Sequence, residues 1–163
     1  MSELQIIKFT ELFEPIKRNL WKFILSLTRN KSIAEDVYSQ TVLIAFENFE
    51  KLKNDKTFLS YLFTLSSRIY YKSKKSNRNL KFENLDSVLE MNDENSNSEN
   101  ILEIKLLKET LNKLPDKIRE SVFLHYFMGF SIKEISKIQI TTIANVKIRL
   151  FRGRKFLIKY INS

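Results

Sequence analysis

The chain has 163 residues, of which 28 are Lys or Arg and 19 are Asp or Glu, giving a formal net charge of +9. It contains no Cys, one His and two Gly. This composition excludes cysteine-based zinc sites, iron–sulfur clusters, disulfides, thiol nucleophiles and glycine-rich phosphate loops. Scarce Gly and Pro, with 43% apolar residues, favour an all-α protein with a buried core.

No apolar run approaches the roughly 18 residues that a membrane span requires, and the N-terminus lacks the apolar stretch of a signal peptide. We therefore expect a cytoplasmic protein without direct membrane insertion. Its charge is segregated along the chain. Residues 1–80 carry 14 basic and 8 acidic side chains, residues 81–100 carry 1 and 6, and residues 101–163 carry 13 and 5. Two basic bodies flank an acidic strip, a pattern that indicates two polyanion-binding faces.

The acidic strip is rich in Asn and Ser and almost empty of apolar residues after Met91. Such a segment buries too little apolar surface to offset the entropy lost on ordering. We predict a flexible linker over residues 83–100, joining a domain at 1–82 to a domain at 101–163. An exposed loop within a single domain is the alternative.

Apolar residues recur at three- and four-residue steps over 12–27, which predicts a first helix. Ser32, followed three residues later by Glu35, has the pattern of a capping box and predicts a second helix that runs to about residue 48. A third helix is predicted over 58–72. The first half is therefore expected to be a three-helix body.

In the second half, a helix from residue 101 should end before Pro115, because the residue before a proline disfavours the helical region. The next helix is predicted over 116–128 and ends at Gly129, in the position of a left-handed cap. His125 has no metal or nucleophile partner nearby in the sequence and is expected to be a packing or surface residue.

Ser131 and Glu134 form a second capping-box pattern, which predicts a short helix over 132–138. Thr142 is placed to cap a last, basic helix. Its inward residues are expected to be Ile143, Val146 and Leu150. A short helix, a tight turn and a basic helix form a helix-turn-helix pattern, whose second helix enters the major groove of DNA.

Candidate base contacts lie at the start of that last helix, at Thr142, Asn145, Lys147 and Arg149. A basic helix can instead be only a solvated face, and Thr142 only a cap. Residues 62–75 interleave aromatics, hydroxyls and cations, which suits single-stranded nucleic acid.

Aromatic residues at helical spacing are core residues more often than ligand contacts. Phe63 and one of Tyr70 or Tyr71 are therefore expected in the core. The adjacent carboxylates Glu35 and Asp36 diverge on a helix and do not form an acid/base pair. We find no catalytic residues, no metal ligands and no cofactor site in the sequence.

Four segments, residues 34–46, 58–68, 134–136 and 146–157, together with Leu114-Pro115, resemble sigma factors of the extracytoplasmic-function (ECF) group in order and spacing. These proteins are the subunits of bacterial RNA polymerase that confer promoter recognition. The resemblance covers nearly the whole chain. It implies a non-enzymatic initiation factor with two helical domains, of which the first opens the −10 element and the second reads the −35 element.

The resemblance also implies partners and site residues. Asp36, Ser39 and Gln40 would dock on the clamp helices of the largest polymerase subunit. The partners would be core polymerase, including its flap, promoter DNA and an anti-sigma protein. Single-stranded −10 DNA would contact Lys53, Asn54, Lys56, Ser67, Arg68, Tyr71 and Lys72. Duplex −35 DNA would contact Ser131, Thr142, Asn145, Lys147, Arg149, Arg152 and Arg154.

Five positions depart from the family pattern: Ser39, Gln40, Tyr61, Arg68 and Ile140, the last in place of the turn glycine. They bear on the strength of docking, the −10 sequence and the geometry of the turn. The alternative function is an autonomous helix-turn-helix regulator that binds a palindromic duplex without polymerase. A nucleic-acid-processing enzyme has the least support, because the sequence offers no clustered carboxylates, His pair or phosphate loop.

Overall fold

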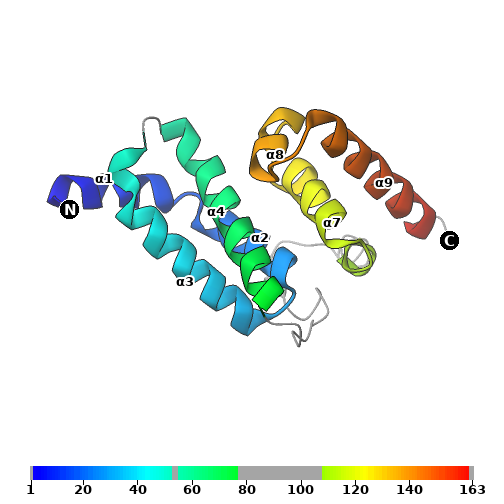
Figure 1. The fold of residues 1–163 in the computed structure, drawn as a ribbon, viewed down its shortest axis with the longest axis horizontal. Helices are drawn as coiled ribbons and strands as arrows, with labels where there is room; N and C mark the ends of the chain where they lie inside the picture. Colours follow the sequence, from blue (N-terminus) through cyan, green and yellow to red (C-terminus); the bar gives the residue numbers. More distant parts are fainter. Residues whose placement is uncertain (1, 53–54, 77–107, 162–163) are drawn as a thin grey trace, which may run out of the picture.

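The computed structural model describes residues 2–52, 55–76 and 108–161 (Figure 1). Within these ranges every regular element is helical, which confirms the all-α prediction. The elements are α1 (Glu3–Phe13), α2 (Lys17–Thr28), α3 (Lys31–Glu47), η1 (Phe49–Lys51), α4 (Asp55–Ser76), α7 (Asp116–Val122), η2 (Phe123–Phe127), α8 (Ile132–Ile138) and α9 (Ile143–Ile161). The predicted linker at 83–100 lies outside the described residues. None of the described helices is long and apolar enough to cross a membrane.

The first predicted helix is wrong in one respect, because two helices occupy its span. Pro15 separates α1 from α2: it has no backbone N–H, and its ring would clash with the carbonyl four residues earlier. Ser2 caps α1 through a capping box with Gln5. The periodicity continues across the break, which is why the pattern by itself suggested a single helix.

The second predicted helix is confirmed as α3, but its cap lies two residues earlier than expected. The side chain of Asn30, not Ser32, accepts a hydrogen bond from the backbone N–H of Ile33 at 3.0 Å. Asn is as good an N-cap residue as Ser, and the choice depends on the extended backbone of Asn30. The third helix, α4, is longer than predicted and spans Asp55–Ser76.

In the second half, the observed helices agree closely with those predicted from the sequence. Residues 108–112 are helical, and α7 begins at Asp116, directly after Pro115. The α-helix ends at Val122 and continues as the single π turn η2. Gly129 then adopts a left-handed conformation with φ of 77°. The capping role assigned to Gly129 is therefore confirmed, and its helix ends in a wider turn than an α-helix has.

The helix-turn-helix prediction is confirmed in its elements. Ser131 and Glu134 form the capping box of α8, and the hydroxyl of Thr142 accepts a hydrogen bond from the backbone N–H of Asn145 at 3.1 Å. Val146 and Leu150 are buried, as expected. Ile143 was expected inside, but this expectation is wrong: its side chain is 45% exposed.

The turn between α8 and α9 contains Ile140 with φ of 51°. A β-branched residue rarely adopts this left-handed region, where its side chain crowds the backbone. The resemblance described above implies a glycine at this position, so the departure noted in the sequence coincides with a strained backbone. The side chain of Ile140 is 62% exposed.

Helix α9 packs closely on α7 through Gly153. A Cβ at this position would lie 2.4 Å from Cγ2 of Val122 and 3.3 Å from Cγ2 of Ile118. Glycine is therefore required here by space, not by backbone conformation. The close crossing fixes α9 on α7 and leaves the opposite face of α9 toward solvent.

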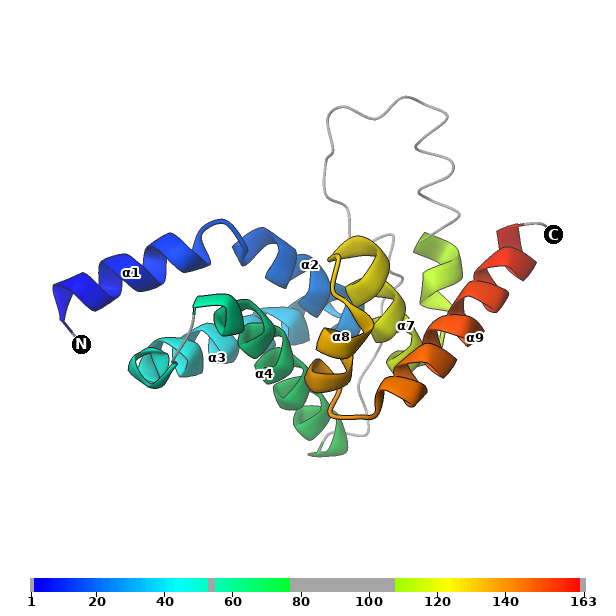
Figure 2. The ribbon, with the colours of Figure 1, turned by 90° about the horizontal axis from the view of Figure 1, so that it is seen from above.

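The two halves pack against each other (Figure 2). Helix α4 lies against α8, and α2 lies against α7. An aromatic cluster joins them: the rings of Phe23 and Phe63 are 4.9 Å apart, and the ring of Phe63 is 5.0 Å from that of Phe130 in an edge-to-face arrangement. Such aromatic pairs contribute about 0.5–1.5 kcal/mol beyond the burial of their area. Phe63 and Tyr70 are both fully buried, as the sequence predicted for Phe63 and for one of the two tyrosines.

Candidate functional site

Helix α3 presents the three residues expected to dock on polymerase on one exposed face. Asp36, Ser39 and Gln40 are spaced three and four residues apart, which places them together on the helix surface. All three are exposed. The opposite face of the helix packs into the core through the buried residues Ala34 and Val37. The face with Asp36, Ser39 and Gln40 is therefore anchored to the core and accessible to a partner.

Helix α4 divides the residues expected to contact single-stranded DNA into two groups. Arg68 and Lys72 are exposed. Ser67 is only 4% exposed, and Tyr71 is partly buried, because both side chains face the second half. Lys53 and Asn54 lie outside the described residues. Lys56 belongs to α4, but its side chain lies outside the part of the chain that the structure describes.

Ser67 and Tyr71 both donate hydrogen bonds to Glu120 of α7. The Ser67 hydroxyl lies 3.0 Å from Oε1, and the Tyr71 hydroxyl lies 2.8 Å from Oε2. Glu120 is 2% exposed. The ammonium group of Lys117 lies 3.6 Å from the centre of the Tyr71 ring, within the range of a cation–π interaction. Each carboxylate oxygen of Glu120 thus binds a different residue of α4.

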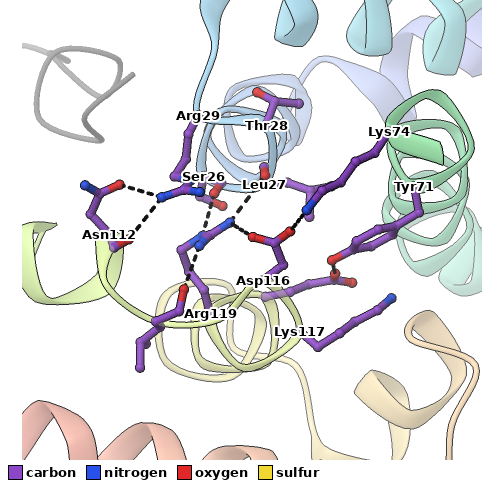
Figure 3. A network of polar contacts seen from close by, with 12 residues as sticks. Ser26, Leu27, Thr28, Arg29, Tyr71, Lys74, Asn112, Asp116, Lys117 and Arg119 are labelled. Atoms are coloured by element: carbon purple, nitrogen blue, oxygen red, sulfur yellow. Dashed lines mark hydrogen bonds and ion pairs between the residues drawn. The ribbon is translucent and has the colours of Figure 1, made fainter. Parts of the chain in front are cut away.

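Arg119 of α7 is 1% exposed, and its guanidinium is surrounded by acceptors (Figure 3). Nε donates to the carbonyl of Ser26 at 3.0 Å, and Nη2 donates to that of Leu27 at 3.5 Å. Nη1 donates to the carbonyl of Leu114 at 2.9 Å, and Nη2 pairs with Asp116 Oδ1 at 2.8 Å. Arg119 therefore satisfies the carboxyl end of α2 from the second half, as a basic side chain near a helix C-terminus does.

Asp116 links this cluster to α4, because its second oxygen, Oδ2, pairs with Lys74. Burial opposes ionisation of Asp116, but hydrogen bonds and charge from Lys74 and Arg119 outweigh it and hold its pKa below the usual value. A further contact between the halves joins Arg29 to Asn112, whose backbone and side-chain oxygens lie 3.1 and 3.2 Å from the guanidinium.

The environment around Glu120 disfavours charge. Burial raises the pKa of Glu120, although Lys117 opposes the shift, and burial lowers the pKa of Lys117. Burial and the neighbouring Glu120 raise the pKa of Tyr71 far above its usual range. Burial also raises the pKa of Tyr70 to about 12, and its hydroxyl has no hydrogen-bond partner among the described residues. The hydroxyls of both tyrosines therefore stay protonated at neutral pH.

We name the group formed by Ser67, Tyr71, Lys74, Asp116, Lys117, Arg119 and Glu120 the polar latch. Sequence reasoning missed its members in α7, because the charged run 116–120 was taken only as a helix start. Glu120 is three and four residues before the buried residues Phe123 and Leu124. That spacing places Glu120 on the apolar face of the helix and could have identified it as buried.

Helix α9 carries two kinds of basic residue. Lys147 and Arg152 are exposed, together with Ile148 and Phe151, and Phe151 is 59% exposed. Arg149, in contrast, is partly buried, and its Nη1 donates to Oε1 of Gln139 at 2.9 Å. Thr142 and Asn145 are exposed at the start of the helix. The outward face of α9 is therefore mixed basic and apolar.

Gln139, at the end of α8, connects α7, α8 and α9 through hydrogen bonds. Its Oε1 accepts from the Ser121 hydroxyl at 2.7 Å as well as from Arg149, and its Nε2 donates to the Lys117 carbonyl at 3.1 Å. Arg149 is thus positioned by the turn of the helix-turn-helix. The guanidinium of Arg154 contacts the Tyr126 hydroxyl at 3.1 Å, and Ser131 is exposed while it caps α8.

His125 lies in η2, where its Nδ1 is 2.8 Å from the carbonyl of Phe130. It is half-buried, as expected from the sequence for a packing or surface residue. Among the described residues, no group of three or more His, Asp or Glu side chains is arranged to hold a metal ion.

The chain is therefore a helical protein of two packed halves. Its second half contains a helix-turn-helix whose last helix presents basic side chains to solvent. Residues 104–157 match the family model described as sigma-70, region 4. The ECF RNA polymerase sigma factor SigM of Bacillus subtilis (strain 168) is 27% identical over 149 residues, which cover 90% of this chain and 91% of that protein.

A second relative, the ECF RNA polymerase sigma factor EcfG of Rhodopseudomonas palustris (strain TIE-1), is 26% identical over 140 residues, covering 85% of this chain and 77% of its own. The fold is also that of the sigma factor RpoE from Bartonella quintana, solved in complex with the anti-sigma factor NepR. That structure has a TM-score of 0.77 and 21% identity, and the match covers 96% of this chain and 98% of RpoE. The chain is a homologue of these two ECF sigma factors, and the match to sigma-70, region 4 lies in its C-terminal part.

Proposed function

We propose that this chain is a sigma factor, which directs core RNA polymerase to promoters and initiates transcription without catalysing a reaction itself. The observation that carries the proposal is the helix-turn-helix of residues 131–161 inside a region 4 domain, in a chain homologous to ECF sigma factors over most of its length. Its site of action would be the cytoplasm, where the polymerase and the chromosome are.

In this proposal the first half, residues 1–82, docks on the clamp helices of the largest polymerase subunit. The exposed face of α3 with Asp36, Ser39 and Gln40 supports this role. The same half opens the −10 element and holds its displaced strand on α4. Opening a duplex costs a few kcal/mol per base taken out of the stack, which stacking and phosphate contacts must offset. Arg68 and Lys72 are exposed for such contacts.

The second half, residues 101–163, would read the −35 element as duplex DNA and contact the polymerase flap. The outward face of α9 combines Lys147 and Arg152, which suit phosphates or guanine, with Ile148 and Phe151. Apolar side chains in a major groove contact thymine methyl groups. The acidic linker at 83–100 would be repelled by DNA and lie along the polymerase.

Transcription in vitro tests the proposal. Core polymerase is incubated with genomic DNA fragments with and without the purified chain, and the 5′ ends of the transcripts are sequenced. We expect transcripts that start at a common distance from shared −35 and −10 elements only when the chain is present. Failure of the chain to join core polymerase, or transcripts without shared upstream elements, would show the proposal to be wrong.

The autonomous regulator is distinguished in the same samples. It predicts tight binding to a palindromic duplex in the absence of polymerase and no new transcription start sites. An anti-sigma protein is expected as a further partner, because the similar sigma factor RpoE was solved in complex with an anti-sigma factor. Purification of the chain from its source cell with bound polymerase subunits and a stoichiometric inhibitor would identify it.

A further inference from the structure

Arg149 is a partly buried cation on a helix whose other described cations are exposed. Its Nη1 donates a hydrogen bond to Oε1 of Gln139 at 2.9 Å. Asn145, one turn before it on α9, and Arg152, one turn after it, are both exposed. Residues three and four positions apart share one side of a helix. A guanidinium released from Gln139 would therefore reach the edge of α9 that carries Asn145 and Arg152.

Gln139 is the acceptor for Arg149, and its own side chain is fixed on α7. Gln139 is 7% exposed. Its Nε2 donates to the Lys117 carbonyl at 3.1 Å, and its Oε1 accepts from the Ser121 hydroxyl at 2.7 Å. A guanidinium can only donate hydrogen bonds, so the amide oxygen must be the atom that faces Arg149. The two bonds to α7 thus orient an acceptor toward this one cation.

The electrostatic environment of Arg149 opposes the position that it occupies. Burial lowers the pKa of Lys117, and the positive charge of Arg149 lowers it further, so the two cations lie near each other. Glu120 offsets little of this repulsion, because burial raises its pKa and favours its neutral form. Like charges repel, which favours movement of Arg149 toward solvent. The hydrogen bond to Gln139 counteracts this tendency.

We infer that Gln139 is a positioning residue that keeps Arg149 away from the DNA backbone. Contacts to phosphate add affinity for every sequence alike, whereas contacts to bases give specificity. A cation held on the scaffold therefore lowers the affinity for unrelated DNA and leaves base reading to the exposed residues of α9. Gln139 thus raises the ratio of specific to non-specific binding without contacting DNA itself. The inference rests on the proposed function, because it takes α9 as the helix that reads duplex DNA.

Substitutions at Gln139 test this role. Gln139→Leu keeps a similar volume and removes all three hydrogen bonds, whereas Gln139→Glu keeps acceptor oxygens for Ser121 and Arg149. The double variant Gln139→Leu, Arg149→Met has no guanidinium to release. Fluorescence anisotropy measures the affinity of each full-length chain for a labelled duplex of unrelated sequence, from about 50 to 200 mM salt.

Gln139→Leu should steepen the slope of log affinity against log salt by about 0.9, the value for one added phosphate contact. Its affinity should accordingly fall about three- to fourfold more than that of the wild type between those salt concentrations. Gln139→Glu should keep the wild-type slope, and the double variant should return to it. Loss of a merely structural contact would not steepen the slope, because it would add no contact to phosphate.

A wild-type slope in a folded Gln139→Leu variant would overturn the inference. A steeper slope that persists in the double variant would also overturn it, because a cation other than Arg149 would then make the added contact. Far-ultraviolet circular dichroism and thermal unfolding report whether each variant is folded.

A second measurement uses the unaltered chain and does not depend on the folding of a variant at Gln139. The Nε–H signals of Arg149 and Arg152 are assigned in nuclear magnetic resonance spectra by their loss in Arg149→Met and Arg152→Met. Addition of the unrelated duplex should shift the signal of Arg152 and leave that of Arg149 in place. Equal shifts of both signals would overturn the inference. A wild-type chain that binds no duplex at low salt would instead contradict the proposed function, and this inference with it.

Discussion

At the scale of single residues, the charged groups of the polar latch behave in opposite ways. Asp116 is stabilised as an anion, because Lys74 and Arg119 hold its pKa below the usual value despite burial. Glu120 is stabilised in its neutral form, because burial raises its pKa. One carboxyl group therefore contributes to an ion pair, and the other contributes mainly as a hydrogen-bond acceptor for α4.

The raised pKa of Glu120 predicts how stability depends on pH. The neutral form is favoured by folding, so its contribution is fully present below the ordinary pKa of 4.5 and is lost as pH rises through the pKa of the folded state. Glu120→Gln should abolish this loss, so that its free energy of unfolding falls less than that of the wild type as pH rises from 4.5. Urea unfolding at a series of pH values measures the difference.

Glu47→Gln, at an exposed position of α3, is the control and should leave the pH dependence unchanged. Titration of Asp116 does not contribute to the change in stability above pH 4.5. Its lowered pKa means that its contribution is present above its ordinary value of 3.8 and is lost only as pH falls below it. A variant at Glu120 with the same slope as the wild type above pH 4.5 would contradict the assignment of a raised pKa.

Arg119 is predicted to be the most costly polar residue to replace. Arg119→Met keeps most of the volume but leaves the carbonyls of Ser26, Leu27 and Leu114 without their buried donor. Breaking a buried charged network by removing one partner reduces the free energy of unfolding by about 3–5 kcal/mol. Chemical denaturation measures the loss. Arg152→Met, the same change at an exposed position, should have an effect below about 0.5 kcal/mol.

At the scale of elements, the helix-turn-helix is stabilised by contacts of α9 with α7 and α8. Gly153 allows α9 to approach α7, and Gln139 joins α7, α8 and α9 through hydrogen bonds. The turn itself contains the strained residue Ile140. The orientation of α9 is therefore fixed by packing and hydrogen bonds strong enough to maintain an unfavourable backbone conformation in the turn.

Ile140→Gly is expected to stabilise the protein. A left-handed conformation costs an L-residue roughly 1–2 kcal/mol, and glycine avoids this cost but adds roughly 0.5–1 kcal/mol of unfolded-state entropy. The net gain in the free energy of unfolding should be about 0.5–1 kcal/mol. Ile140 is 62% exposed, so little packing is lost. Thermal and urea unfolding measure the change.

The matched control is Ile148→Gly, at an exposed position within α9. There the backbone is helical, and glycine should destabilise the protein by about 1 kcal/mol. Opposite signs for the same substitution would identify backbone strain at Ile140 as the cause. Destabilisation by both variants would show that the left-handed turn is not strained.

Arg149 and Arg152 are predicted to act differently in duplex binding. Arg152 is exposed, and Arg152→Ala should lower the slope of log affinity against log salt by about 0.9 if it neutralises one phosphate. Arg149 is bonded to Gln139, so Arg149→Ala should weaken binding through the position of α9, with little change in slope. Fluorescence anisotropy on a promoter duplex, measured from low to moderate salt, separates the two. Equal loss of slope in both variants would place Arg149 on a phosphate.

At the scale of the whole molecule, two basic halves are packed through α4 with α8 and α2 with α7. This arrangement leaves the docking face on α3 and the outward face of α9 exposed, while it covers part of α4. The faces proposed for polymerase and for duplex DNA are therefore exposed, whereas Ser67, on the helix proposed to hold single-stranded DNA, is buried.

Asp36→Ala is expected to separate these surfaces functionally. Asp36 is exposed on α3, away from α9, so the variant should lose affinity for core polymerase while its duplex affinity and its stability stay the same. Surface plasmon resonance with immobilised core polymerase measures the first property, and anisotropy with duplex DNA measures the second. A variant that binds polymerase as the wild type does would exclude Asp36 from the docking contact.

The sequence by itself determined the local structure: capping residues and apolar periodicity depend on neighbours three or four positions apart. The capping box of α8, the left-handed cap at Gly129 and the buried residues Val146 and Leu150 are confirmed for this reason. The two errors of prediction, a single helix across Pro15 and a cap at Ser32 in place of Asn30, are also local. In each, two neighbouring sequence features favoured different helix boundaries.

Only the tertiary structure decided which charged residues are buried. Arg119 and Glu120 resemble surface residues in the sequence, because their partners, Ser26, Ser67 and Tyr71, are 49 to 93 positions away. A charge can be buried only when such partners converge on it, and their convergence depends on how the two halves pack. The sequence thus indicated two DNA-binding halves, whereas the packing of those halves determined which of the expected DNA-contact side chains are covered.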